Sequence, residues 1–399
     1  MKPSALKMLA SNLSMRKLQL LAALALGTAI VAGGCSKSDQ TASTTSGGTS
    51  PTTAPAAPAA GTPLTVGFIY VGTKDDYGYN QAMADGAAAV KKIPNVTVLE
   101  QEKVAETTNC EQVMSTMIDQ GDASLIFATS FGYFKPHVLT IAPKYPKAEF
   151  LHAGGLLGDG DPPNIGTFFA YIDELEWCCG MAAGSATKSG KMGYVAAKPI
   201  PPVLRDINAF ELGAKSVNPN ATLTVIFTGD WFLPDKEADA VKSLADQGID
   251  VVSGHIDSPK VMIQTAEGRG LMSCGYHYDC SSLAPKGYLT GAEWNWAPMM
   301  TRFVSDYMAG KPMPHNYMGS VRDDSVKLSP YGPLVAKDMQ DKIEAVKAEM
   351  VAGTFKMFKG PLKDNAGNTV IPDGTSYGDQ DLDLWKMNYL VDGVKGNLK

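Results

Sequence analysis

Histidine is scarce in this chain, and a surplus of positive charge is missing. The 399 residues carry a formal net charge of −6 at pH 7 and include five histidines: His137, His152, His255, His277 and His315. Histidine supplies most metal binding and acid–base catalysis near neutral pH, so the chain offers few sites for such chemistry. Nucleic-acid binding depends on Lys and Arg side chains that face phosphates, and the acidic balance gives it no support.

The short motifs that mark common enzyme active sites are also missing. The sequence contains no H-E-x-x-H, no Walker A loop, no G-x-S-x-G elbow and no G-x-G-x-x-G after a predicted strand. The glycines within residues 154–158 have the wrong spacing for a phosphate-binding loop. Asp257 and Asp279 could serve a secreted hydrolase, but Asp residues at strand ends usually cap helices. We therefore expect a binding protein without a cofactor, not an enzyme.

Cysteine is sparse, with six residues. Cys274 and Cys280 are close enough in sequence to close a small loop as a disulfide. Together with His277 and Asp279 they also offer zinc-type ligands, but these are crowded into one loop, whereas structural zinc sites usually combine two separated pairs. We expect a disulfide there and no metal. The adjacent Cys178 and Cys179 should not bridge to each other easily.

No apolar run is long enough for a comfortable membrane span. Arg16 and Lys17 precede the longest candidate, residues 18–31, which ends in small residues as export signals do. The following AGGC at 32–35 resembles the cleavage site of bacterial lipoproteins, with Ala32 where Leu is preferred. We expect residues 1–35 to be a lipoprotein signal with Cys35 acylated, in a protein exported and anchored at the cell membrane or in the periplasm. Ordinary secretion with cleavage nearby is the alternative.

A low-complexity segment separates this leader from the folded body. Residues 36–62 are dominated by Thr, Ser, Ala, Pro and Gly and show no hydrophobic periodicity, so we expect a disordered tether. From residue 63 onward, short β-branched strands alternate with helices of about a dozen residues, which is typical of parallel sheets. The predicted fold class is α/β, with two doubly wound lobes joined by a hinge. We assign residues 63–168 and 291–322 to lobe I, and 169–290 and 323–399 to lobe II.

One stretch organises the second lobe. Residues 222–227 read as a strand, Gly229 ends it, Trp231 and Phe232 follow, and Pro234 stands where a helix begins. Gly248 then closes that helix, and Asp257 and Ser258 precede Pro259 as caps of the next helix. The two aromatic residues therefore fall at the carboxyl end of a strand, where ligands bind in open α/β sheets.

Pairs of aromatic residues recur at such strand ends. A flat ligand between rings of this kind gains about 0.5–1.5 kcal/mol per stack beyond area burial. Polar neighbours such as Ser130 and Asn295 could read the edge of the ligand. The predicted ligand-binding residues are Tyr77, Tyr79, Ser130, Phe131, Gly132, Tyr171, Trp231, Phe232, Asp257, Ser258, Tyr276, Trp294 and Trp296.

Several segments resemble the basic membrane protein family of substrate-binding lipoproteins, which serve ABC-type importers. The resemblance covers residues 64–396, and its most specific segments are TSFGY at 129–133, GYVA at 193–196, INAF at 207–210, WF at 231–232, KEA at 236–238, DQGID at 246–250 and HIDS at 255–258. It implies a type I periplasmic-binding-protein fold, a purine ligand and permease subunits as partners. It also implies that Tyr77 and Trp231 sandwich the purine, while Asp257 and residues 129–132 line the pocket.

Two departures from the family bear on the ligand. Nucleoside-binding members place a basic residue near the strand that here reads GAEWNW at 291–296, and Leu233 stands where many members have Asp or Asn. Both changes affect contacts to the ribose. We therefore expect a free nucleobase such as adenine, with a nucleoside as the second choice, bound by a monomer. The alternative is a receptor for a different small solute that feeds a sensor.

Overall fold

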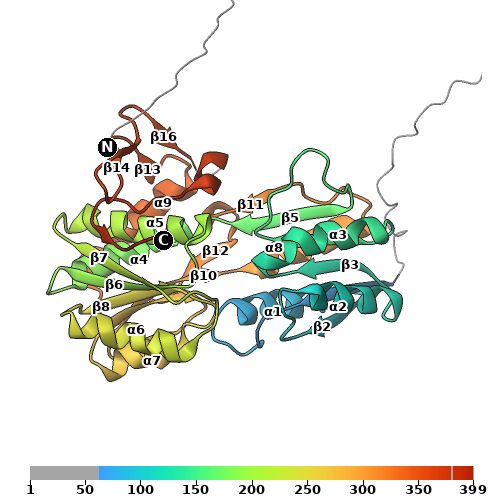
Figure 1. Cartoon of the computed structure of the whole chain (residues 1–399), viewed down its shortest axis with the longest axis horizontal. Coiled ribbons are helices and arrows are strands. Elements are labelled where there is room, and N and C mark those ends of the chain that lie inside the picture. The colour runs from blue at the N-terminus through green and yellow to red at the C-terminus, as the bar shows by residue number, and fades with distance from the viewer. Residues whose placement is uncertain (1–62, 379–380, 399) are drawn as a thin grey trace, which may run out of the picture. The chain divides into compact units, whose positions relative to one another are not determined.

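The protein is built on two sheets of mostly parallel strands (Figure 1). The two sheets share a strand order, apart from one additional edge strand in the second sheet. The computed structural model describes residues 63–378 and 381–398. The strands of the first sheet are β1 (Leu64–Ile69), β2 (Val96–Gln101), β3 (Ala123–Ala128), β4 (Glu149–Ala153), β5 (Ile165–Ala170) and β11 (Tyr317–Gly319). Their order is β11-β5-β4-β3-β1-β2, and every pair is parallel.

The second sheet repeats this plan. Its strands are β6 (Lys191–Ala196), β7 (Thr222–Phe227), β8 (Val251–His255), β9 (Met272–His277), β10 (Tyr288–Trp294), β12 (Val326–Leu328) and β17 (Val394–Lys395). The order is β12-β10-β9-β8-β6-β7-β17, with β12 antiparallel to β10. In both sheets the order reverses beside the first strand, between β1 and β3 and between β6 and β8. Ligands bind at such switch points, outside the carboxyl ends of the strands.

Helices cover both faces of each sheet. Cores of buried apolar side chains place α1 (Tyr79–Val90) and α8 (Trp296–Met308) over one face of the first sheet, and α2 (Thr108–Asp119) and α3 (Leu139–Ile141) over the other. In the second sheet α4 (Asp173–Ala186) and α5 (Pro201–Val217) cover one face, and α6 (Pro234–Asp246) and α7 (Lys260–Gly268) cover the opposite face (Figure 1). These layers leave the strand ends free to form a site.

The chain passes between the sheets at points that differ from the predicted boundaries. β5 lies in the first sheet up to Ala170, two residues beyond the expected crossing. β10 lies wholly in the second sheet, whereas the prediction returned the chain to lobe I from residue 291. All seven residues of β10 are buried between β9 and β12, so the strand completes the second sheet before the chain leaves it at Asn295.

The carboxyl-terminal segment packs on the second sheet. Helix α9 (Lys337–Val351) contacts α4, and β17 pairs with β7 as the outermost strand. Between them lie two short antiparallel pairs, β13 (Phe358–Lys359) with β16 (Ser376–Tyr377) and β14 (Leu362–Lys363) with β15 (Thr369–Ile371).

The local predictions around α6 agree with the structure, while the cap of α7 does not. Helix α6 begins at Pro234, and Gly248 has the left-handed φ of 77° that suits a residue after a helix. Helix α7 has Pro259 as its cap residue, without a side-chain cap. Asp257 and Ser258 are buried instead, and they contact the first lobe.

The predicted disulfide is wrong. Cys274 and Cys280 are both free, and they are buried in different apolar clusters. The Cys274 thiol lies 3.6 Å from the carbonyl oxygen of Cys179, while the Cys280 thiol lies 3.6 Å from that of Tyr77. The two residues are close in sequence, but a strand end between them sends their side chains into separate layers.

The predictions for the leader lie outside the described residues. This applies to the signal at 1–35, to acylation of Cys35 and to the tether at 36–62. Among the residues that the structure does describe, no helix has both the length and the apolar character needed to cross a membrane.

Candidate functional site

A cavity with a free volume of about 40 Å³ lies where strand ends of the two sheets face each other. We call it the inner cavity. It is lined by Tyr79, Ser130, Phe131, Phe169, Ile200, Pro202, Trp231, His255, Asp257, His277 and Trp294. These residues lie at the carboxyl ends of strands β5, β8, β9 and β10 and in the segments that follow β1, β3, β6, β7 and β8, as the topology predicts.

Packed aromatic rings form one wall of the inner cavity. The rings of Phe169 and Trp294 have centroids 4.9 Å apart, and Trp294 stacks on Trp296 with centroids 4.6 Å apart. Trp296 is 1% exposed and belongs to the core behind this wall. Because Trp294 ends β10 and Phe169 lies in β5, one residue from each sheet supplies this surface.

Trp231 lies at the mouth of the inner cavity. Its ring centroid is 6.2 Å from that of His255, and Lys198 places its Nζ 4.9 Å from the ring centroid of Trp231. The same Nζ lies 2.8 Å from Oδ1 of Asp230. A cation over one face of an indole holds the ring in place and leaves the opposite face for a flat ligand.

Two histidines line the inner cavity, and each is held by a buried partner. Nδ1 of His255 lies 2.6 Å from Oδ2 of Asp206, which also accepts a hydrogen bond of 2.6 Å from the Tyr276 hydroxyl. Nδ1 of His277 accepts a hydrogen bond of 2.6 Å from Nε1 of Trp294. Burial lowers the pKa of His277 well below its usual value, and the neighbouring His255 adds to the effect. His277 is therefore neutral.

Asp257 brings a carboxyl group to the inner cavity. Burial raises its pKa well above the usual range, and the carboxylates of Asp76 and Glu106 add to the rise while Lys198 opposes it. A carboxyl group in these surroundings favours a partner that donates hydrogen bonds to it. It can therefore anchor the N–H groups of a ligand.

A second hollow adjoins the inner cavity and shares Trp231 and Asp257 with it. We call it the outer hollow; it is lined by Val71, Gly72, Thr73, Asp76, Asn80, Lys103, Ala105, Glu106, Thr107, Lys198, Asp230, Trp231, Phe232 and Asp257. Glu106 organises its floor, because Oε1 accepts hydrogen bonds from the Ser130 hydroxyl and from the backbone N–H of Gly132. A Cβ at Gly132 would lie 2.3 Å from Cδ of Glu106, so a larger residue there would displace the Glu106 carboxylate.

Backbone contacts join the two lobes beside Asp257. The N–H of Tyr79 donates to the carbonyl oxygen of Asp257 over 2.9 Å, and the Ser258 hydroxyl donates to the carbonyl oxygen of Asp76 over 2.5 Å. Gly78 lies directly against this seam. An added Cβ would fall 1.9 Å from the carbonyl oxygen of Asp257. The first and second lobes thus meet at residues 76–79 and 257–258.

The structure brings six of the predicted ligand-binding residues together around the inner cavity: Tyr79, Ser130, Phe131, Trp231, Asp257 and Trp294. Gly132 and Phe232 lie at its edges, against Glu106 and on the outer hollow. Ser258 serves the contact between the lobes, and Tyr276 and Trp296 support the lining from behind. Tyr77 lies apart, with Nζ of Lys260 5.2 Å from its ring centroid.

Sequence reasoning missed His255, His277 and Phe169, together with Lys198 of the outer hollow. His255 ends β8 and His277 ends β9. Their position at strand ends was the sequence signal that could have identified them as lining residues. Their orientation depends on hydrogen bonds with Asp206 and Trp294, which come close to the two histidines only in the folded chain. Among the residues that the structure describes, no group of three or more His, Cys, Asp or Glu is placed to hold a metal ion.

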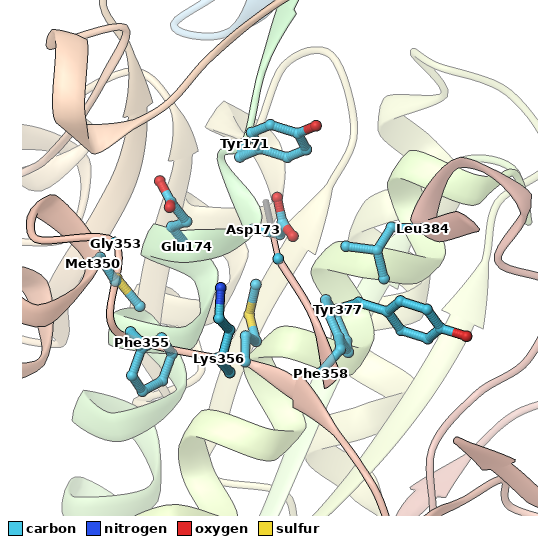
Figure 2. Close-up of a pocket in the computed structure, with 12 residues that line it drawn as sticks. Tyr171, Asp173, Glu174, Met350, Gly353, Phe355, Lys356, Phe358, Tyr377 and Leu384 are labelled. Carbon is cyan, nitrogen blue, oxygen red and sulfur yellow. The ribbon is translucent and has the colours of Figure 1, made fainter. Parts of the chain in front are cut away.

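Tyr171, the remaining predicted residue, lines a different pocket. Figure 2 shows it with Asp173 and Glu174 opposite Phe355, Lys356 and Tyr377 of the carboxyl-terminal segment. The Tyr171 ring lies under the guanidinium of Arg205, with 4.7 Å from Cζ to the ring centroid. Tyr171 therefore packs where the chain crosses between the sheets, away from the inner cavity.

Glu174 beside this pocket predicts a pH dependence of stability. Burial raises its pKa from 4.5 to about 8. The folded protein therefore binds more protons than the unfolded chain between these pH values, and the stabilisation present below pH 4.5 is lost as the pH rises to 8. We expect Glu174→Gln to reduce the fall in the free energy of unfolding over this range, measured by urea unfolding at several pH values.

The matched control for this prediction is the same substitution on the surface. Glu349→Gln changes an exposed side chain of α9 and should leave the slope against pH as it is in the parent protein. Burial also raises the pKa of Glu211, to about 8, so part of the slope should persist in Glu174→Gln. A slope that is identical in the parent protein and in Glu174→Gln would contradict the assignment.

Comparison with known proteins gives a consistent family match. A family model described as "ABC transporter substrate-binding protein PnrA-like" matches residues 64–354. The sequence is 34% identical over 339 residues to a purine-binding protein of Brucella abortus (strain 2308), which covers 84% of this chain and 94% of the relative. It is 28% identical over 361 residues to a Haloferax volcanii protein with the provisional name ABC transporter glucose-binding protein TsgA13. This match covers 90% of this chain and 88% of the relative.

A solved structure supports the fold. The crystal structure of an ABC transporter solute-binding protein from Aeropyrum pernix K1 superposes with a TM-score of 0.65, covering 81% of this chain and 96% of that chain. The sequences are 16% identical, so this likeness concerns the fold alone. Together with the two parallel sheets, it confirms the predicted type I periplasmic-binding-protein fold.

Proposed function

The chain belongs to the PnrA-like family of ABC transporter substrate-binding proteins, and on that premise we propose that it binds a purine, with a nucleobase such as adenine favoured over a nucleoside. Proteins of this family bind solutes for ABC importers and are not enzymes. The chain is accordingly an extracytoplasmic receptor for a small molecule, with permease subunits as its partners.

The observation that carries the proposal is the set of aromatic side chains that line the inner cavity. Trp231 follows β7 of the second sheet, and the packed rings of Phe169 from the first sheet and Trp294 from the second offer a further aromatic surface. Asp257 and the two histidines add hydrogen-bonding groups at the edges of that space. A flat heterocycle with ring nitrogens uses both features, because it stacks on rings and exposes donors and acceptors along its rim.

A free base is favoured over a nucleoside by the lack of basic groups. Of the described residues, those lining the inner cavity include no lysine or arginine. By the resemblance noted above, nucleoside-binding members of the family use a basic residue near this strand to hold the ribose. This chain has Trp294 and Asn295 in that region instead. Lys198 of the outer hollow is engaged by Asp230.

A sugar ligand is the second candidate, because the Haloferax volcanii relative is named for glucose binding. Sugars bind through hydroxyl groups and stack through one apolar face, so they use paired aromatic walls less fully than purines do. A direct comparison decides between them. Adenine, guanine, hypoxanthine, their nucleosides and glucose should be screened by thermal shift. A ligand at about 100 times its dissociation constant adds roughly 2.7 kcal/mol of stability.

The proposal predicts that Trp231→Ala weakens purine binding by about 10- to 100-fold, since a stack and its buried area are both lost. Isothermal titration with the best purine of the screen measures this loss. Trp231→Phe should keep most of the affinity. Phe232→Ala is the matched control, because this neighbouring ring is 56% exposed and does not line the inner cavity.

Stabilisation by nucleosides alone would overturn the preference for a base, and stabilisation by glucose alone would overturn the purine assignment.

We also propose that the protein acts as a monomer anchored by acyl chains on Cys35. The mass of the amino-terminal peptide from detergent-extracted protein tests the anchor, and an unmodified cysteine there would exclude it.

A further inference from the structure

The bond between Trp294 and His277 determines where the imidazole proton lies. An indole N–H can only donate a hydrogen bond, so Nδ1 of His277 must be the acceptor over their 2.6 Å contact. The ring is neutral because burial and the neighbouring His255 lower its pKa. A neutral imidazole carries one proton, so this proton is on Nε2.

The Nε2 atom of His277 is a buried donor without an acceptor. His277 is 2% exposed, and Nε2 has no hydrogen-bond partner within 3.5 Å among the described residues. The backbone of Ile256 is near enough to the ring to act against the lowering of its pKa. Buried polar atoms in folded proteins are almost always hydrogen-bonded, so such an atom requires an explanation. His277 lines the inner cavity, and a bound ligand is therefore the natural source of the missing acceptor.

The backbone and the neighbouring rings hold His277 in this orientation. Its φ is 71°, a left-handed conformation that is uncommon for a residue other than glycine. The ring centroid lies 3.9 Å from that of Tyr276 and 5.3 Å from that of Tyr79. Strained backbone conformations concentrate at functional sites, where the surrounding structure maintains them.

The required ligand chemistry follows from the groups in the inner cavity. Nε2–H of His277 needs a hydrogen-bond acceptor, such as an sp² ring nitrogen or a ring carbonyl oxygen. The Asp257 carboxyl suits the N–H donors of the same ligand. A purine base presents both kinds of group on one flat ring system.

We propose that His277 recognises the ligand by donating a hydrogen bond from Nε2–H to a ring acceptor, and that Trp294 is the positioning residue that keeps this proton on Nε2. This inference rests on the proposed purine-binding function for the identity of the acceptor. The proton position itself is a property of the chain and is testable without any ligand.

The first test is the tautomer of His277 in the protein without added ligand. ¹⁵N-labelled histidine in the full chain gives separate nuclear magnetic resonance patterns for the two neutral tautomers, and His277→Phe identifies the signal. We expect Nε2–H in the parent protein. In Trp294→Phe, which keeps a ring but removes the indole donor, we expect a mixture of tautomers. A charged ring or an Nδ1–H tautomer in the parent protein would overturn the proposal.

The second test links this proton to one atom of the ligand. Adenine and its 1-deaza, 3-deaza and 7-deaza analogues, each lacking one ring nitrogen, should be titrated against the parent protein and His277→Phe. We expect one analogue to bind about tenfold more weakly than adenine to the parent protein, which corresponds to about 1.4 kcal/mol. In His277→Phe this difference should shrink to about threefold or less, because the donor is gone.

The outcomes separate the two proposals. If purines bind but every deaza penalty is the same in His277→Phe, the His277 contact is wrong while the purine function stands. If the parent protein binds no purine and shows Nε2–H, the purine function is wrong, and titration of glucose against His277→Phe then decides whether the donor serves another acceptor. Equal affinity of the parent protein and of His277→Phe for every ligand that binds would overturn the recognition role of His277.

Discussion

Replacing Arg205 with methionine should lower the free energy of unfolding by about 3–5 kcal/mol, because it leaves a buried carboxylate without its counter-charge. Nη2 of Arg205 lies 2.6 Å from Oδ1 of Asp173, and both side chains are 4% exposed. Burial raises the pKa of Asp173, and Arg205 acts against that rise. The pair joins α5 to the first turn of α4, directly after the chain has crossed between the sheets.

Urea unfolding followed by circular dichroism measures this loss. Lys242→Met is the matched control, since Lys242 forms a 2.9 Å pair with Asp239 on the surface of α6 at 52% and 75% exposure. A surface pair contributes at most about 1 kcal/mol. The double substitution Arg205→Met with Asp173→Leu should recover part of the stability, because it removes both buried charges. A loss below about 1 kcal/mol for Arg205→Met would show that the pair is effectively solvated.

Local sequence signals predicted the elements that form the site, because they act over a few residues. The Gly229 break, the aromatic pair and Pro234 placed Trp231 at the end of β7 and before α6. Alternation of strands and helices predicted parallel sheets, and thereby a site at strand ends. These inferences need no knowledge of distant contacts.

Which residue of each aromatic pair lines the inner cavity could not be predicted in the same way. Tyr79 lines the inner cavity, whereas Tyr77, two residues earlier, has a φ of 55° and lies beside Lys260. Trp294 lines the inner cavity, whereas Trp296 turns into the core. Side-chain direction at a strand end depends on the backbone of the following loop, which the hydrophobic pattern does not specify.

The two histidines needed contacts that are distant in sequence. Asp206 is 49 residues from His255, and Trp294 is 17 residues from His277. Only the order of strands in the second sheet brings β9 and β10 side by side, and α5 beside β8. A scarce residue type at two strand ends was informative, but its function depended on the tertiary structure.

Gly78 also depends on a tertiary contact, because it packs against the carbonyl oxygen of Asp257 in the other lobe. We expect the two lobes to close on the ligand. Gly78→Ala should then weaken binding of the best purine by at least about 100-fold, since about 2.8 kcal/mol of contacts that depend on closure would be lost. The added Cβ would lie 1.9 Å from the carbonyl oxygen of Asp257, far inside contact distance. The lobes would then have to separate, breaking the bond from Tyr79 N–H to Asp257 and that from Ser258 to Asp76.

Titration calorimetry gives the affinity, and small-angle X-ray scattering shows whether the ligand still makes the protein more compact. Gly158→Ala is the matched control, because nothing lies within 4 Å of a Cβ at that glycine. It should bind and close like the parent protein. A Gly78→Ala protein that contracts on binding with parental affinity would mean that residues 76–79 move independently of closure. Loss of affinity together with loss of contraction would tie ligand capture to the contact between Gly78 and Asp257, since a ligand held by one lobe alone touches only part of the inner cavity.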